Sequence, residues 1–267
     1  MKIFFWIAEI LFNIVYGNLF SRYLLTHSYK KARLKMSGFL IFRRSHFYQP
    51  SNDSFTQCLI NLHLEYYCII YKPYNVLSQF TSSEGKQTLK ELFDVPVDVY
   101  PVGRLDYDSE GLLVLTNDKK VNHELLNPGF AHTREYWVQV DGAITSDAIR
   151  KLQQGVDINV EGKIYRTKQC KASIFETAPV VAERSPPIRV RKNIPSPWIR
   201  IVLTEGKNRQ VRKMTAAVGF PTLRLIRYRI EKCTLEGLQP GEMRIFTRGE
   251  LYHYLFPNRN DSPKSGL

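Results

Sequence analysis

Residues 103–118 hold the feature that most restricts the fold, a short polar loop that runs directly into an apolar segment. The loop lies between Gly103 and Gly111, and the apolar run Leu112–Leu115 follows it before the chain turns polar again. This order predicts a tight loop that leads into a buried strand. A loop held by a buried strand is a rigid support for a reactive side chain.

Three acidic side chains, Asp106, Asp108 and Glu110, stand beside Arg104 in this loop. Their mutual repulsion is tolerated where a cation, a metal or a chemical role compensates for it. One interpretation is an exposed turn whose acids cap backbone groups. A second is a calcium loop, but Asn117 occupies the twelfth position, where an EF-hand needs a bidentate glutamate. The third is a catalytic loop in which one acid is the nucleophile.

The motif Gly-Arg-Leu-Asp at 103–106, followed by Ser-Glu-Gly-Leu-Leu-Val-Leu-Thr-Asn-Asp at 109–118, resembles the signature of RsuA-type RNA pseudouridine synthases. Lys-Pro-x-x-x-Leu at 72–77 resembles the first motif of that family. Residues 220–228 are most similar to its RluE-like members, which modify large-subunit ribosomal RNA. In this family the aspartate of Gly-Arg-Leu-Asp is the nucleophile, which implies that role for Asp106.

Two more positions receive roles from the resemblance. Residues 134–140 predict a strand, and on its alternation alone Tyr136 is an ordinary half-buried core tyrosine. The family motif of a basic residue, here Arg134, followed by x-Tyr-x-Val implies that Tyr136 lies against the uracil ring. The basic residue after Gln-Val in the third motif implies that Arg212 pairs with the catalytic Asp106.

The chain is strongly basic, with 38 Lys and Arg against 25 acidic residues and a formal net charge of +13. Such an excess suggests a polyanionic partner, although solubility also explains it. The proline-rich basic segment 178–198 is either a solvated insertion or an arm along RNA phosphates, and these two interpretations are evenly balanced. The residues predicted to contact RNA are Arg104, Arg189, Arg191, Lys192, Lys207, Arg209, Lys213, Arg224 and Arg227.

The four cysteines and six histidines show no spacing typical of metal ligands, and no phosphate-binding glycine loop occurs. The reaction implied by the resemblance detaches uracil from its nitrogen link and rejoins it through carbon, without gain or loss of atoms. We therefore expect neither a metal nor an organic cofactor. The cysteines indicate reduced thiols of a cytoplasmic protein. We also expect ribosomal RNA as the partner, a monomer, and no membrane contact.

Residues 1–62 are expected to form an N-terminal extension without a clear S4 domain. Residues 3–20 are apolar enough for a signal peptide or an anchor, but Glu9 and Asn13 interrupt a run that is short for a membrane span. We favour a translation start at Met36, or an extension that fits no targeting signal. Residues 63–257 are expected to form the catalytic domain and residues 258–267 a polar tail.

Strands and short helices alternate without a repeating strand–helix rhythm, which predicts an α+β fold with a mixed, mostly antiparallel sheet. Asp118 and Asn208 are the expected N-caps of two helices. The resemblance implies two sheet-containing halves that flank a cleft, with Asp106 at its floor. Strands are expected at 65–71, 112–115, 134–140, 198–203 and 223–230, and helices at 86–93, 119–126, 146–154 and 209–218.

The predicted function is site-specific isomerisation of uridine to pseudouridine in ribosomal RNA, with 23S RNA of the large subunit as the expected substrate. One alternative is a non-catalytic RNA-binding or ribosome-assembly protein, whose mark would be loss of the acid at 106 or of the base at 212. Both residues are present. A second alternative is a glycoside hydrolase that uses Asp106 and Asp108 as its two carboxylates, but the basic excess suits RNA better than a neutral sugar.

Overall fold

The computed structural model describes residues 65–188 and 193–257. The chain divides into two units between His63 and Leu64, and all described residues belong to the second unit. The predictions for residues 1–62, for a start at Met36 and for the tail at 258–267 lie outside the described residues. Within the two described ranges, no helix has the length and apolar character needed to cross a membrane.

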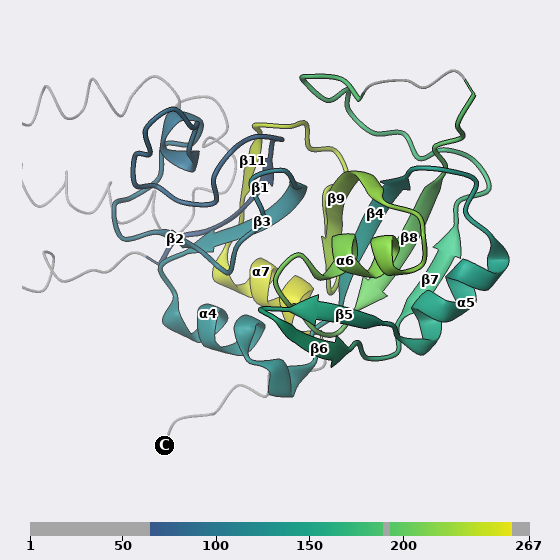
Figure 1. The fold of residues 1–267 in the computed structure, drawn as a ribbon. Helices are drawn as coiled ribbons and strands as arrows, with labels where there is room; N and C mark the ends of the chain where they lie inside the picture. The colour runs from purple at the N-terminus through teal and green to yellow at the C-terminus, as the bar shows by residue number, and fades with distance from the viewer. Residues whose placement is uncertain (1–64, 189–192, 258–267) are drawn as a thin grey trace, which may run out of the picture. The chain divides into compact units, whose positions relative to one another are not determined.

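One mixed sheet organises the described part of the chain (Figure 1). Its main strands, in spatial order, are β11 (Met243–Ile245), β1 (Tyr67–Lys72), β3 (Glu110–Thr116), β9 (Thr222–Ile230), β4 (Arg134–Val140), β8 (Trp198–Leu203) and β7 (Lys171–Ile174). The short strands β2 (Tyr100–Pro101) and β10 (Cys233–Thr234) pair with β3 and β9, and β5 (Asp157–Val160) forms a separate hairpin with β6 (Lys163–Arg166). Among these pairs only β3 and β9 run parallel, so the predicted α+β class with a mostly antiparallel sheet is confirmed.

The two halves of the sheet meet where β3 crosses β9. These strands pair at only two positions, Glu110 with Ile226 and Gly111 with Arg227. Gly111 has a φ of +118°, and a Cβ atom on it would lie 2.4 Å from the carbonyl oxygen of Arg227. Only glycine fits such a close approach of two backbones. The two predicted halves are therefore joined at the end of the loop 103–111, which carries the three acids and is called the acidic loop below.

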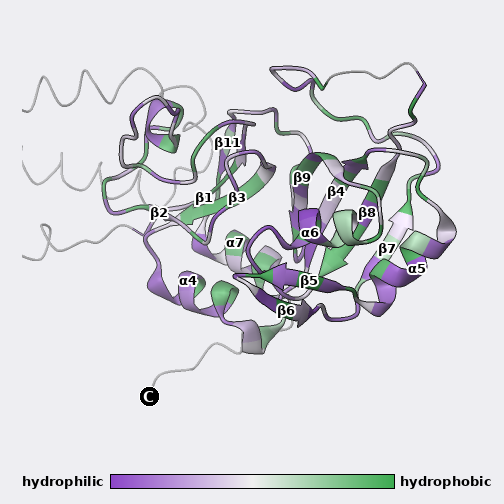
Figure 2. Ribbon diagram, viewed as in Figure 1, coloured by the Kyte–Doolittle hydropathy of each residue, from purple (hydrophilic) through white to green (hydrophobic). Residues whose placement is uncertain are grey.

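Both faces of β3 are covered, which explains its unbroken apolar run. Leu112 and Val114 face a core that includes residues of helices α4 (Lys119–Leu126) and α7 (Arg248–Leu255). Leu113 and Leu115 face a second core, built with the 3₁₀-helix η1 (Leu89–Glu91). Burying each of these side chains stabilises the fold by about 1.5–3 kcal/mol. Figure 2 shows β3 in the hydrophobic colours, whereas α4 is largely hydrophilic on its outer side.

The other half of the sheet has its own core. Helices α5 (Ser146–Gln154) and α6 (Gln210–Ala217) pack there against β4, β8 and β9. Helix α6 buries Val211, Met214 and Thr215, as its apolar spacing predicts. A further 3₁₀-helix, η2 (Pro128–Phe130), follows α4. The helices predicted at 119–126 and 146–154 are confirmed, and the side chain of Asp118 caps α4 by accepting from the Lys120 amide at 2.8 Å.

Two local predictions are wrong. The helix expected at 86–93 shrinks to η1, because Lys86 and Thr88 form β-bridges with Ser83 and Leu77. Asn208 does not cap α6, because the N-cap position falls on Arg209, which adopts a left-handed conformation with a φ of 53°. No side chain caps α6, and the Gln210 side chain instead accepts from the Lys207 amide at 2.8 Å in the turn before the helix.

Candidate active site

The acidic loop is held in place by hydrogen bonds to Ser78, which lies outside the loop, and by a hydrogen bond between two of its own residues. The Ser78 hydroxyl donates to the Leu105 carbonyl at 2.8 Å and accepts from the Leu105 amide at 3.1 Å. Within the loop, the Ser109 amide donates to the Asp106 carbonyl at 3.1 Å. Because the backbone is held on both sides of Asp106, its carboxylate has a defined place, and the side chain remains 33% exposed.

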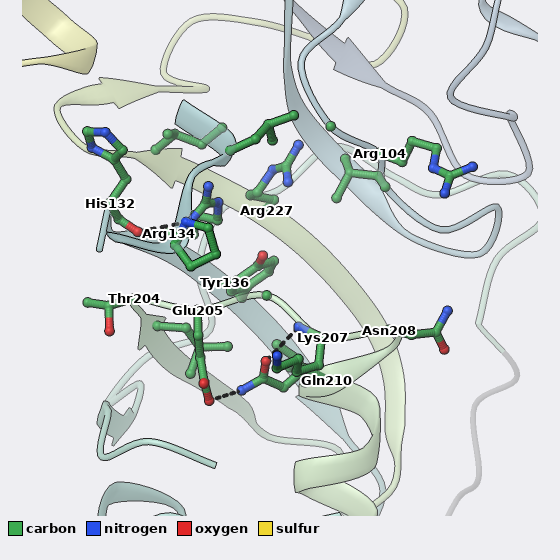
Figure 3. A pocket seen from close by; sticks show the side chains of 18 of the residues that line it. Arg104, His132, Arg134, Tyr136, Thr204, Glu205, Lys207, Asn208, Gln210 and Arg227 are labelled. Carbon is green, nitrogen blue, oxygen red and sulfur yellow. Dashed lines mark hydrogen bonds between the residues drawn. The ribbon is translucent and has the colours of Figure 1, made fainter. Parts of the chain in front are cut away.

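Asp106 opens onto a pocket of about 770 Å³. This volume is within the usual range for sites that hold a small molecule or a single nucleotide-sized group. The pocket is lined by the loop 103–106, by residues of the segment 125–134, by residues of β4 and β9, and by the segment 203–211. Figure 3 shows Arg134, Tyr136 and Arg227 on one side of this space and the segment from Thr204 to Gln210 beneath them.

The arginines of α6 reach the acidic loop, but mainly at Asp108. Arg209 donates two hydrogen bonds of 2.8 Å to the Asp108 carboxylate, and its distance to Asp106 Oδ2 is 3.9 Å. Arg212 places Nε 3.4 Å from Asp108 Oδ2 and donates from Nη2 to the Asp108 carbonyl. Burial raises the pKa of Asp108, but these two arginines together hold it below its ordinary value.

The predicted pairing of Arg212 with Asp106 is therefore corrected. The Arg212 side chain is only 13% exposed, and Arg212 is not among the residues that line the pocket. Asp106 still acts on Arg212 through its charge, although burial lowers the pKa of this arginine. Among the described residues, the ion-pair partner of Asp106 is Arg209, whose Nη1 lies 3.9 Å from Asp106 Oδ2.

Tyr136 and Arg227 face each other across neighbouring strands at the back of the pocket. The register of β4 and β9 pairs the two residues directly. Tyr136 is half-buried and lines the pocket, as its predicted role requires. Arg227 is only 6% exposed, and its Nε donates to the Leu112 carbonyl at 2.8 Å. Arg227 thus lies on the pocket floor and not on an outer surface, which corrects its predicted contact with phosphates.

Arg224 does not contact the pocket. Its side chain is 6% exposed and makes two hydrogen bonds, of 2.8 and 2.7 Å, to the buried carboxylate of Glu110. It also donates to the Ala182 carbonyl at 2.9 Å, which ties the proline-rich segment to the sheet. A buried pair of this kind stays together because breaking it would leave one charge uncompensated. The predicted phosphate contact of Arg224 is therefore wrong.

The other residues predicted to contact RNA differ in whether they line the pocket. Arg104, Lys207 and Arg209 are exposed and line the pocket, so the structure brings them to one rim. Lys207 also lies over the ring of Tyr165, 4.9 Å from its centroid. Lys213 is half-buried and does not line the pocket. Three of the basic residues of the proline-rich segment, Arg189, Arg191 and Lys192, lie outside the described residues.

Lys72, the first residue of the Lys-Pro motif, is a buried cation whose side chain the sequence analysis gave no role in the site. Its side chain is fully buried, and Nζ donates to the carbonyls of Pro73 at 2.9 Å and Val76 at 2.7 Å. Burial lowers the pKa of Lys72 to about 7, against the opposing charges of Glu110, Asp108 and Asp106. A lysine at the end of an apolar strand and directly before a proline was the available signal.

Glu205 is a buried carboxylate in the pocket lining that was also missed. It accepts from the Lys168 amide at 2.9 Å and from the Gln210 side chain at 2.6 Å, and the Tyr165 hydroxyl donates to its other oxygen. These neutral donors join the β5–β6 hairpin to the start of α6. Glu205 therefore shapes the pocket by holding two segments together. Its position directly before the Gly-Lys-Asn turn gave no local sign of this.

The described residues contain no group of three or more His, Cys, Asp or Glu side chains placed to hold a metal ion. The three described cysteines, Cys68, Cys170 and Cys233, are free thiols. Burial raises the pKa of each, to about 12 for Cys68 and Cys233 and to about 11 for Cys170. Such thiols are poor nucleophiles, and none of the three lines the pocket.

Comparison with solved structures places the fold among the pseudouridylate synthases. A crystal structure of a pseudouridylate synthase superposes with a TM-score of 0.58 at 24% sequence identity, covering 72% of this chain and 74% of the other. The family model for RNA pseudouridylate synthases matches residues 66–217. The chain belongs to this RNA pseudouridylate synthase family.

Comparison with named relatives shows which members of the family this chain resembles. The ribosomal large subunit pseudouridine synthase E of Vibrio parahaemolyticus is 49% identical over 174 residues, which are 65% of this chain and 71% of the relative. The enzyme of the same name from Xanthomonas axonopodis is 48% identical over 64% of this chain and 89% of the relative. The ribosomal large subunit pseudouridine synthase B of Bacillus subtilis is 33% identical over 69% of each chain. The RsuA-type, RluE-like resemblance seen in the motifs is thereby confirmed.

Proposed function

We propose that this enzyme isomerises a specific uridine of large-subunit ribosomal RNA to pseudouridine, with Asp106 as the nucleophile. The single observation that carries the proposal is the partly exposed Asp106 carboxylate, held by a fixed loop at the edge of a 770 Å³ pocket. The substrate class comes from the relatives with 46–49% identity, which are named large-subunit pseudouridine synthases.

The pocket suits a nucleotide that has left its stack. Everting a base costs a few kcal/mol, and stacking on the ring of Tyr136 returns about 1–3 kcal/mol. The exposed cations at the rim, Arg104, Lys207 and Arg209, are placed to neutralise phosphates of the surrounding strand. The base would then lie between Tyr136 and the Asp106 carboxylate.

Asp106 has the surroundings of a usable nucleophile. The Asp108 carboxylate accepts two hydrogen bonds from Arg209, and Arg212 donates to the Asp108 backbone carbonyl, so both arginines are engaged at Asp108. Arg209 nevertheless lies 3.9 Å from the Asp106 carboxylate. Carboxylates form covalent intermediates of this type in other enzymes. Asp108 is therefore proposed to position the arginines and Asp106 to react.

Asp106→Asn tests the proposal. The amide keeps the shape of the side chain but lacks the nucleophilic oxygen, so pseudouridine formation on a 23S RNA transcript should become undetectable. The melting temperature and the RNA dissociation constant should stay close to those of the wild type. Asp147→Asn, on the exposed face of α5, is the matched control and should keep full activity. Turnover by Asp106→Asn would remove Asp106 from the nucleophilic role.

The remaining expectations are part of the same proposal. The isomerisation conserves all atoms of the nucleotide, so the enzyme is proposed to work without a metal or an organic cofactor. Residues 63–257 are proposed as the catalytic domain, acting as a monomer in the cytoplasm without membrane contact. Chemical mapping of pseudouridines in ribosomal RNA from a deletion strain would identify the uridine, and one lost site in 23S RNA is the expected result.

A further inference from the structure

Arg227 carries a hydrogen-bond donor that the folded chain does not use. Its Nε is bonded to the Leu112 carbonyl, but Nη2 is buried and has no hydrogen-bond partner among the described residues. The residue is 6% exposed, lines the pocket and lies beside Tyr136 (Figure 3). A buried donor of a charged group that stays unpaired bears its full desolvation penalty. Such a donor at a pocket floor indicates an acceptor that arrives with the ligand.

The depth of Arg227 distinguishes it from the other cations of the pocket. The side chain of Arg209 is 42% exposed and Arg104 is exposed, so both can meet the hydrated phosphates of a strand that passes the rim. The part of an everted nucleotide that enters deepest is the base. A guanidinium only donates hydrogen bonds. The acceptor that fits a donor at this depth is therefore a carbonyl oxygen of the base.

We propose that Arg227 is a catalytic residue that recognises the uracil ring, with Nη2 donating to a ring carbonyl oxygen, O2 or O4. This inference rests on the proposed function and assigns a residue to the base itself. Arg227 stabilises the negative charge that the base acquires during the reaction. A donor aimed at O4 also selects uracil over cytosine, because cytosine carries an amino group at that position.

The electron balance of the isomerisation explains why this charge appears. When the C1′–N1 bond breaks, its electron pair stays with the base, and the negative charge spreads over N1, O2 and O4. After the base turns, C5 bonds to C1′, the hydrogen on C5 leaves as a proton, and N1 takes up a proton. The base is neutral before and after these steps, and no oxidant or reductant takes part. Arg227 donates a hydrogen bond throughout and transfers no proton.

The electrostatics of the site agree with this role. Burial lowers the pKa of Arg227, while the neighbouring Tyr136 and Asp106 act in the opposite direction. A guanidinium stays protonated in proteins even when its pKa is lowered. The pocket floor thus holds a permanent positive charge in a site shielded from water, where hydrogen bonds to a developing anion are strongest.

The experiment combines substitutions of Arg227 with changes to its proposed acceptor. The site is first mapped in a 23S RNA transcript with the wild-type enzyme. A fragment that contains it is then transcribed with uridine, 2-thiouridine or 4-thiouridine, since sulfur is a weaker acceptor than oxygen. The variants are Arg227→Gln and Arg227→Lys. The matched control is Arg229→Gln, which removes an arginine from the same strand where it pairs with Glu135, away from the pocket.

The wild type should react on the order of tenfold more slowly with one of the two thio-substituted fragments. Arg227→Gln should be on the order of 100-fold slower with uridine, as for removal of one donor to a developing anion, and should show no further loss with that thio fragment. RNA affinity and melting temperature should change little. The control should match the wild type on all three fragments.

Three results would overturn the assignment. A wild type that reacts equally fast with all fragments has no such hydrogen bond, and this arm does not depend on how the variants fold. A slow Arg227→Gln or Arg227→Lys that keeps the wild-type preference for oxygen would show a purely structural role. Variants as active as the wild type would exclude any role. A wild-type enzyme that forms no pseudouridine in 23S RNA would instead overturn the proposed function itself.

Discussion

Asp106 and Asp108 are two residues apart in the chain but have different surroundings. Asp108 is surrounded by two arginines that lower its pKa, whereas Asp106 faces the pocket with one arginine at 3.9 Å. The division follows from the turn between them, which points one carboxylate toward α6 and the other toward the open side. At the scale of single residues, the two acids therefore differ in their partners. Arginines bind Asp108, whereas Asp106 faces the pocket, where it is proposed to react.

Substitutions of Tyr136 distinguish the stacking of its ring from hydrogen bonding by its hydroxyl. Its ring lines the pocket and its hydroxyl lies close to the buried guanidinium of Arg227. Tyr136→Phe keeps the ring and should retain activity within about threefold, whereas Tyr136→Ala should lose the stacking contribution of about 1–3 kcal/mol. Single-turnover rates on the mapped RNA fragment measure both. Equal losses in the two variants would show that the hydroxyl is the important group.

Lys72 makes stability depend on pH. Its pKa is about 7 in the folded protein and about 10.5 in the unfolded chain, so the unfolded state binds more protons between these values. The penalty of burying Lys72 is therefore complete below pH 7 and is relieved as the pH rises toward 10.5. Relative to Lys72→Met, the wild type should gain about 2 kcal/mol of unfolding free energy between pH 7 and pH 9. Urea denaturation at both pH values measures this, and parallel changes in the two proteins would contradict it.

At the scale of elements, the parallel contact of β3 and β9 sets the active-site geometry. It places Arg227 beside the end of the acidic loop, and the Glu110–Arg224 pair lies buried at the same crossing. Arg209, the N-cap of α6, and Arg212, within α6, both contact Asp108. Helix α6 and strand β9, which follow each other in the chain, therefore meet a loop about 100 residues earlier in the sequence.

Gly111→Ala tests this crossing. The new methyl group would lie 2.4 Å from the Arg227 carbonyl oxygen and would force a φ of +118° on an alanine. We expect a loss of about 4 kcal/mol in unfolding free energy, from backbone strain and overpacking together. Gly219→Ala is the control, because Gly219 also has a positive φ but has open space around its Cβ position. It should lose only about 1–2 kcal/mol, and similar losses in both variants would exclude the close contact as the cause.

At the scale of the whole molecule, the net charge of +13 and the exposed cations at the pocket rim point to the same ligand. Buried cations do not add to this surface, because Arg224 is neutralised by Glu110 and Arg227 faces inward. The charge that attracts RNA is therefore carried by the exposed cations and not by the whole basic content of the sequence.

RNA affinity should fall steeply with salt, because each neutralised phosphate releases counterions. Lys207→Gln should lower the slope of log K against log salt concentration by about 1. Lys151→Gln is the control, since Lys151 pairs with Asp147 on the exposed face of α5. Fluorescence titrations of the RNA fragment between 50 and 200 mM salt, a range chosen to span about a fourfold change, measure the slopes. A flat dependence in the wild type would exclude phosphate contacts at the rim.

The sequence by itself determined the local elements and the identity of the reactive loop. The strand after Gly111, the helix capped by Asp118 and the cationic spacing of α6 follow from neighbouring side chains, so short-range patterns were sufficient. The motif around Asp106 gave the family for the same reason. Local patterns failed at η1, where backbone bridges prevent a longer helix, and at Asn208, where the N-cap position falls on Arg209.

The tertiary structure alone decided which charges meet. Arg209 and Asp108 are 101 residues apart in sequence, and Arg224 and Glu110 are 114 apart. In a sequence, every arginine is equally available to an acid or a phosphate. Burial and strand register remove that equivalence, because a desolvated charge must take the nearest partner of opposite sign. For this reason Arg212 contacts Asp108, and Arg224 is buried against Glu110. Arg227 retains one donor, Nη2, which has no partner among the described residues and is available to a ligand in the pocket.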